Sequence, residues 1–191
     1  GTEYAHLYRQ KLVGTEVEIS TGTHVVAINQ KKDVMCISQA GRHKLKTRHL
    51  VLATGCRERT REMLTIAGTR PAGIFTAGLA QEMINIYGLM PGSRFVIIGS
   101  GDIGLIMARR LTLEGAQVLG VFEIQTQLSG LLRNKVTCLD DFQIPLYLEH
   151  ELLEIYGQDR VTGISCLNKK TGQQREIACD TVLFSVGLIP E

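Results

Sequence analysis

The stretch that decides the fold runs from Phe95 to Glu123 and reads FVIIGSGDIGLIMARRLTLEGAQVLGVFE. Its apolar start is typical of a buried parallel strand, and a glycine turn, a helical pattern, a second apolar run and an acid follow. The turn consists of Gly99, Ser100, Gly101, Asp102, Ile103 and Gly104. In order, its glycines permit a tight turn, let a pyrophosphate approach the backbone, and allow close packing of helix on strand.

The ends of the helix and of the second strand predict what this turn binds. The helix would present free N–H groups and a positive dipole end to phosphates. The second strand, expected over Gln117 to Phe122, ends beside Glu123, where a carboxylate can accept hydrogen bonds from an adenosine ribose. Such a carboxylate repels the 2′-phosphate of NADP, so the six turn residues and Glu123 predict a site for NAD(H). Two other interpretations stay open: glycines that only pack, and a pocket for S-adenosylmethionine.

Composition narrows the class of protein. The chain has 191 residues, 44% of them hydrophobic, and a formal net charge of +2, which is enough for one large or two small domains. It has no basic block of the kind that follows nucleic acid, and no apolar run near the roughly 18 residues of a membrane span. The five cysteines are scattered without a CxxC. We therefore expect no disulfide scaffold, no metal site and a reducing, cytoplasmic setting.

An internal repeat gives the wider organisation. Residues 23–55 and 150–187 each read as three strands joined by polar turns, followed by an apolar run that ends in a small-x-Gly tail. The tails are Ala53-Thr54-Gly55 and Ser185-Val186-Gly187. Each copy is expected to be a β meander that leads into a buried strand. Counting back from the first copy places its own glycine fingerprint before Gly1, so we expect a piece of a longer protein.

Between the copies, a connector over residues 57–94 carries one expected helix, at 77–86. A further helix is expected at 131–142, leading to a strand near 144–148. The predicted fold class is α/β: a Rossmann-like, three-layer NAD(P)-binding domain with a β meander, plus the remnant of a second, FAD-type domain. We place the FAD-type segment at 1–58 and the NAD(P)-binding domain at 59–191.

The turn GSGDIG, the repeated meander and the tails ATG and SVGLIPE resemble the FAD-dependent pyridine nucleotide–disulfide oxidoreductase superfamily. The resemblance covers nearly the whole chain. Within it, VLATGCRERTR and residues 101–144 are most similar to flavoprotein oxidoreductases found beside glycerol-3-phosphate dehydrogenase. Opine oxidase and cyanide synthase subunits are more distant.

The resemblance implies roles for individual residues. The turn and Glu123 would carry NAD, Gly187 would lie near the nicotinamide, and Thr54 and Gly55 would close over FAD in the longer protein. Two departures limit the transfer. The redox-active CxxC of the disulfide-reducing members is absent, and Ile106 stands where relatives often have a glutamate.

The predicted function is therefore the NAD(H)-binding portion of an FAD-dependent oxidoreductase that passes hydride between nicotinamide and flavin. The cofactors carry this chemistry, so no catalytic acid or base is predicted. The partners would be the dinucleotide and an electron donor or acceptor, either a small molecule or another subunit. The alternative is a non-enzymatic NAD-sensing or interaction module. Without the upstream segment the chain is expected to be colourless and inactive.

Cationic residues and a cysteine follow the first tail. Arg57, Arg59 and Arg61 could contact a cofactor phosphate or a partner subunit, but a solvated basic loop is the favoured interpretation. Cys56 could be a low-pKa thiol beside these arginines, and a small buried residue at a strand end is the simpler interpretation.

Overall fold

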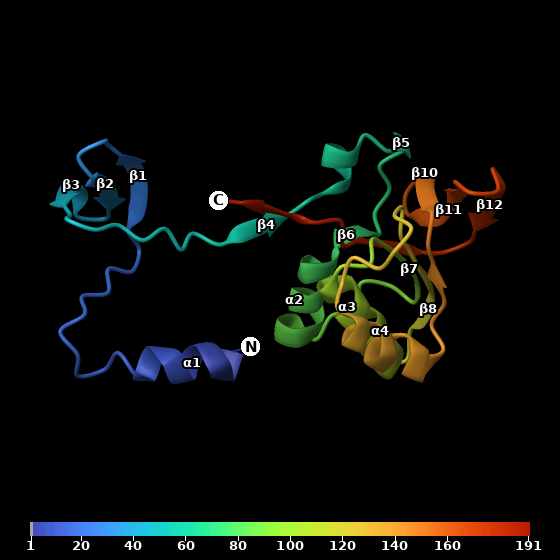
Figure 1. Ribbon diagram of the computed structural model, residues 1–191, viewed down its shortest axis with the longest axis horizontal. Coiled ribbons are helices and arrows are strands. Elements are labelled where there is room, and N and C mark those ends of the chain that lie inside the picture. The colour runs from blue at the N-terminus through green and yellow to red at the C-terminus, as the bar shows by residue number, and fades with distance from the viewer. Residues whose placement is uncertain (1) are drawn as a thin grey trace. The chain divides into compact units, whose positions relative to one another are not determined.

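The computed structural model describes residues 2–191, which form two compact units, the first ending at Ala53 and the second spanning Thr54–Glu191 (Figure 1). The boundary falls earlier than the predicted one, after Glu58. The reason is that β4 (Cys56–Glu58) pairs with β14 (Leu188–Pro190), which ties this segment to the second unit. No helix in residues 2–191 is long and apolar enough to cross a membrane.

The first unit holds one helix and the first meander. Its elements are α1 (Thr2–Gln10), β1 (His24–Ile28), β2 (Asp33–Ser38) and β3 (Gly41–Lys46). The three strands form an antiparallel sheet in the order β1-β2-β3, as the repeat predicts. Only β2 contributes buried residues, namely Asp33, Val34 and Cys36, while β1 and β3 are exposed along their length.

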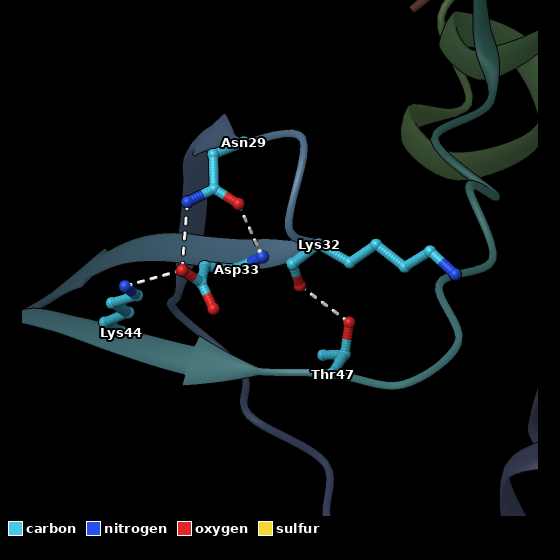
Figure 2. A network of polar contacts seen from close by, with 5 residues as sticks. All are labelled: Asn29, Lys32, Asp33, Lys44 and Thr47. Carbon is cyan, nitrogen blue, oxygen red and sulfur yellow. Dashed lines mark hydrogen bonds and ion pairs between the residues drawn. The ribbon is translucent and has the colours of Figure 1, made fainter.

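A polar network fixes the turn between β1 and β2 (Figure 2). The Asn29 amide donates to an Asp33 carboxylate oxygen at 2.9 Å, and the Asp33 backbone N–H donates to Asn29 Oδ1 at 2.9 Å. Lys44 Nζ lies 2.6 Å from Asp33 Oδ2. Hydrogen bonds from Lys44 and then Asn29 hold the pKa of Asp33 below its usual value. Thr47 adds a bond from its hydroxyl to the carbonyl of Lys32, at 2.8 Å.

The second unit is built on a five-stranded parallel sheet. Its strand order is β6-β13-β7-β8-β9. The strands are β6 (Ile74–Thr76), β13 (Thr181–Phe184), β7 (Arg94–Ile98), β8 (Gln117–Phe122) and β9 (Leu146–Tyr147). All four residues of β13 are buried, because the strand lies between β6 and β7 and is covered on both faces.

Helices cover one face of this sheet and the second meander covers the other. The helices are α2 (Ala77–Tyr87), α3 (Asp102–Leu113) and α4 (Leu132–Cys138), and their apolar residues share one core with Phe95, Ile97 and Leu183. On the other face lie β10 (His150–Gly157), β11 (Val161–Asn168) and β12 (Gln174–Ile177), joined by β5 (Ala67–Gly68). Their core includes Val96, Ile155 and Ile164. The three-layer α/β prediction is confirmed.

Local signals explain where the helices begin and end. The Thr76 hydroxyl accepts from the Leu79 amide at 3.3 Å, and Gly88 ends α2 in the left-handed region at φ 64°. The expected helix over 131–142 is shorter than predicted. It breaks into α4 and a 3-10 turn (Asp140–Phe142), which ends where Gln143 adopts φ 54°. The strand expected near 144–148 narrows to Leu146–Tyr147.

One element of the repeat prediction is wrong. The first tail was expected to follow a buried strand, but residues 50–55 are exposed and have no strand assignment. The physical reason is that no strand among residues 2–191 pairs with them, whereas β13 has a neighbour on each side. An apolar run with free backbone groups on both edges has nothing to stabilise it as a strand.

Candidate dinucleotide-binding site

The turn after β7 leaves three backbone amides free at the start of α3. The N–H groups of Gly101, Asp102 and Ile103 have no acceptor within residues 2–191. The flanking amides are occupied, since Gly99 N–H donates to the Phe122 carbonyl at 2.7 Å and Gly104 N–H donates to Ser185 Oγ at 3.0 Å. Three adjacent free donors at the positive end of a twelve-residue helix form a cradle suited to an anion such as a phosphate.

Close contact with the end of β13 explains why glycines form this turn. A Cβ at Gly104 would lie 2.7 Å from the Ser185 Cβ, and a Cβ at Gly99 would overlap the Ser185 carbonyl oxygen. Gly99 also adopts φ 89°, in the left-handed region. At Gly101 the added Cβ would meet Ser185 Oγ at 3.0 Å, a tight but smaller conflict. The first and third glycines are therefore required by packing, and the second is the least crowded.

Glu123 is buried at the end of β8, with 4% of its surface exposed. Its Oε2 accepts from the Ser100 amide at 3.0 Å, the Ser100 hydroxyl at 2.6 Å and the Ser129 hydroxyl at 2.9 Å. Its Oε1 accepts from the Gln125 amide at 3.0 Å. Burial alone would raise the pKa of Glu123, but the hydrogen bonds outweigh it and lower the pKa below its usual value. The group is therefore an anion at neutral pH.

Asp102, the first residue of α3, ties the segment after β8 to the glycine turn. Its Oδ1 accepts from the Leu131 amide at 2.8 Å and from the Asn134 side-chain amide at 2.8 Å. These two bonds, the backbone one first, hold the pKa of Asp102 below its usual value. Because both donors already engage its Oδ1, the Asp102 carboxylate is tied to this segment.

The turn and Glu123 share one cleft of about 790 Å³, within the range typical of cofactor sites, about 300–1,000 Å³. Its lining includes Gly99, Gly101, Asp102, Ile103 and Glu123. His150, from the start of β10, also lines it. The His150 ring lies edge-on to Phe122, whose ring stacks on Tyr147 at a centroid distance of 4.7 Å.

Gly187 lines the cleft too, beyond the end of β13. It adopts φ 109°, and its carbonyl accepts from the Arg59 amide at 3.1 Å. Thr54 and Gly55 are not part of the cleft lining. The Thr54 hydroxyl donates to the Glu191 carbonyl at 2.6 Å, and the Gly55 carbonyl accepts from the Glu191 amide at 3.1 Å.

The three arginines after the first tail have three different environments. Arg57 pairs with Glu191, with Nε 3.0 Å from Oε1, and Arg59 lines the cleft. The expectation of a solvated loop is wrong for Arg61, which is 2% exposed. Its guanidinium donates to the backbone carbonyls of residues 66–69, so it organises this loop from inside. Cys56 is exposed, which contradicts the buried interpretation.

Sequence reasoning missed two serines of the site. Ser185 lies in the second tail, so the repeat could have drawn attention to it as the residue that meets the turn. Ser129 follows Glu123 by a short polar segment with no recognisable pattern. Only the fold brings its hydroxyl to the carboxylate.

The fold and the cleft define an α/β protein of the Rossmann-like type, with an anion cradle and a buried acid on neighbouring strands. The pyridine nucleotide-disulphide oxidoreductase family matches residues 3–191, and the chain belongs to this family. Homologues in the family use FAD and NAD(P)H, and the family gives the chain a redox role.

Two relatives and one solved structure illustrate the range of similar proteins. Hydrogen cyanide synthase subunit HcnB of Pseudomonas aeruginosa is 33% identical over 179 residues, which cover 82% of this chain and 38% of that subunit. The redox-sensing transcriptional repressor Rex of Clostridium novyi is 27% identical over 118 residues, covering 61% of this chain and 51% of Rex. Thioredoxin reductase of T. acidophilum matches the fold with a TM-score of 0.76 and 22% identity, covering 100% of this chain and 60% of that one.

Proposed function

We propose that residues 59–191 bind NAD(H) in the cleft. The free amides of Gly101, Asp102 and Ile103 would hold the pyrophosphate, and Glu123 would face the adenosine ribose. The observation that carries this proposal is the placement of three unoccupied amides and a buried carboxylate on adjacent strand ends in one cleft.

We further propose that in the complete oxidoreductase the cleft orients the dinucleotide for hydride transfer to or from FAD, with its nicotinamide near Gly187. The dinucleotide supplies the hydride chemistry, and the chain supplies binding and orientation. Residues 1–58 would then be the FAD-type segment, with Thr54 and Gly55 near the flavin. An electron donor or acceptor, either a small molecule or a partner subunit, completes the reaction. Membership of the group found beside glycerol-3-phosphate dehydrogenase stays a prediction.

The similarity to Rex favours a second candidate, a redox sensor that binds NAD(H) without catalysis. The family match weighs against it, because it extends through both meanders rather than the dinucleotide-binding unit alone. The two candidates share the cleft and differ in flavin. Bleaching of a bound flavin by NADH in the full-length protein would support the oxidoreductase, and full-length protein without flavin would support the sensor.

Isothermal titration of the chain with NADH tests the binding proposal. We expect saturable binding, and we expect Gly101→Val to abolish it because the added side chain would fill the space above the free amides. Thermal unfolding of the variant shows whether the fold survives. Equal NADH affinity of the folded variant and the parent would refute the proposal that this turn holds the dinucleotide.

A further inference from the structure

Ser100 is the central residue of a clamp around Glu123. It is fully buried, and its hydroxyl donates to Glu123 Oε2 at 2.6 Å while accepting from the Ser129 amide at 2.9 Å. The Ser129 hydroxyl donates to the same Oε2 at 2.9 Å. One carboxylate oxygen is thus fixed from the glycine turn on one side and from the segment after β8 on the other.

Counting donors shows which oxygen is left for a ligand. A carboxylate oxygen has about two lone-pair sites. Oε2 already receives three donors, the Ser100 amide and the hydroxyls of Ser100 and Ser129, so it has no free site. Oε1 receives one, from the Gln125 amide, and keeps one site free. Glu123 can therefore accept one further hydrogen bond, through Oε1.

The segment that carries Ser129 is itself anchored. Just beyond Ser129, the amide of Leu131 and the side-chain amide of Asn134 both donate to Asp102 Oδ1 at 2.8 Å. The backbone of Glu123 is fixed as well, because its N–H donates to Tyr147 and its carbonyl accepts from His150, each at 2.9 Å. The carboxylate cannot swing away without breaking several of these bonds.

We propose that Ser100 and Ser129 are positioning residues that hold Glu123 so that Oε1 alone meets one hydroxyl of the adenosine ribose. This clamp sets the preference for the dinucleotide without a 2′-phosphate. A mobile carboxylate could turn aside and admit a phosphate, whereas a fixed one keeps both its repulsion and its single acceptor site in place. The inference rests on the proposed NAD(H) site and names the side chains that determine its selectivity.

The experiment compares affinities for ADP-ribose and 2′-phospho-ADP-ribose by calorimetry, since these probes differ only at the ribose hydroxyl. The parent chain should prefer ADP-ribose. We expect Ser129→Ala to reduce the preference about threefold and Ser100→Ala about tenfold, because each loses hydrogen bonds to a charged group. Ser129→Thr keeps the hydroxyl at an exposed position and should restore the parent's ratio.

Ser93→Ala is the matched control. Its hydroxyl also donates to a carboxylate, that of Asp180, in the same unit but outside the cleft lining. This variant should lose some stability and keep the affinity ratio. A merely structural role for Ser129 would give the same result as the control.

The outcomes separate the inference from the function on which it rests. If the parent binds neither probe nor NADH, the proposed function fails. If the parent prefers ADP-ribose and Ser129→Ala keeps the parent's ratio, the clamp is refuted and the binding site stands. Should Ser100→Ala not fold, the pair Ser129→Ala and Ser129→Thr decides the matter alone.

Discussion

The two copies of the meander and tail follow one sequence pattern and have different environments. In the first copy, Val51 is 86% exposed and Leu52 is 68% exposed, and the run they belong to is not a strand. In the second copy, the matching Leu183 and Phe184 are 0% and 1% exposed and lie in β13. Their position between β6 and β7 explains the contrast. An apolar run marks a candidate strand, but neighbouring strands decide whether it becomes one.

Substitution at matched positions of the two tails should show the largest difference. Leu183→Ala removes a fully buried side chain from the parallel sheet and should cost the second unit about 3 kcal/mol of unfolding free energy. Val51→Ala, at an exposed position, should stay within about 0.5 kcal/mol. Denaturant unfolding of both variants measures the contrast, and a cost above about 2 kcal/mol for Val51→Ala would show that the first tail is packed.

The glycine turn extends the comparison to single positions within the second unit. Gly104→Val should destabilise the unit by about 2–3 kcal/mol, because its Cβ would lie 2.7 Å from the Ser185 Cβ. Gly101→Val has more room and should cost less stability while losing dinucleotide binding. Thermal unfolding and NADH titration of the two variants check both halves. Equal stability of the pair would contradict the packing role of Gly104.

Acid titration contrasts the carboxylates Glu123 and Asp33, one in each unit. Both have pKa values lowered in the folded state, so each stabilises fully above its unfolded pKa, 4.5 for Glu123 and 3.8 for Asp33. That stability is lost as pH falls through the lower folded value. Glu123→Gln should therefore cost about 1–2 kcal/mol at pH 7 and progressively less below pH 4.5.

Asp33→Asn should have the smaller effect, because its partner Lys44 is 44% exposed and the pair is screened by salt. Unfolding curves measured from pH 3 to 7, at low and high salt, compare the two. A cost of Glu123→Gln that stays constant across this range would contradict the lowered pKa.

Thiol labelling has the smallest expected effect on the fold. Cys56 is exposed, while Cys36, Cys138, Cys166 and Cys179 are buried. Burial raises the pKa of Cys166 to about 12 and that of Cys179 to about 11, which keeps both thiols protonated. A maleimide should therefore label Cys56 alone in the native protein, with no change in thermal unfolding. Peptide mapping that finds early labelling of Cys166 would contradict the packing of the second meander.

The sequence predicts the central βαβ block closely because its signals are local. The apolar run before Gly99, the glycine spacing and the acid after Phe122 fix a strand, α3 and β8 with little error in their bounds. The strands of both meanders follow in the same way from alternation and polar turns. In each case the residues that determine an element lie within it.

Features that depend on distant partners could not be predicted. The carbonyl cage around Arg61, the approach of Ser185 to the glycines and the bond from Ser129 to Glu123 each join segments without a shared pattern. The exposed first tail is the same lesson in reverse, since its pattern indicates a strand and the described residues provide no partner. Glu123 could be located from sequence, and the four hydrogen bonds that orient it could not.

Amide chemical shifts recorded during titration with NADH test the central claim most directly. We predict that the signals of Gly101, Asp102 and Ile103 move with the ligand concentration as their free N–H groups meet the pyrophosphate, together with that of Ser129 beside Glu123. The amides of β2 and β3 in the first unit should stay unchanged. Saturable NADH binding that leaves the amides of the glycine turn unmoved, or that shifts the first meander instead, would contradict the account.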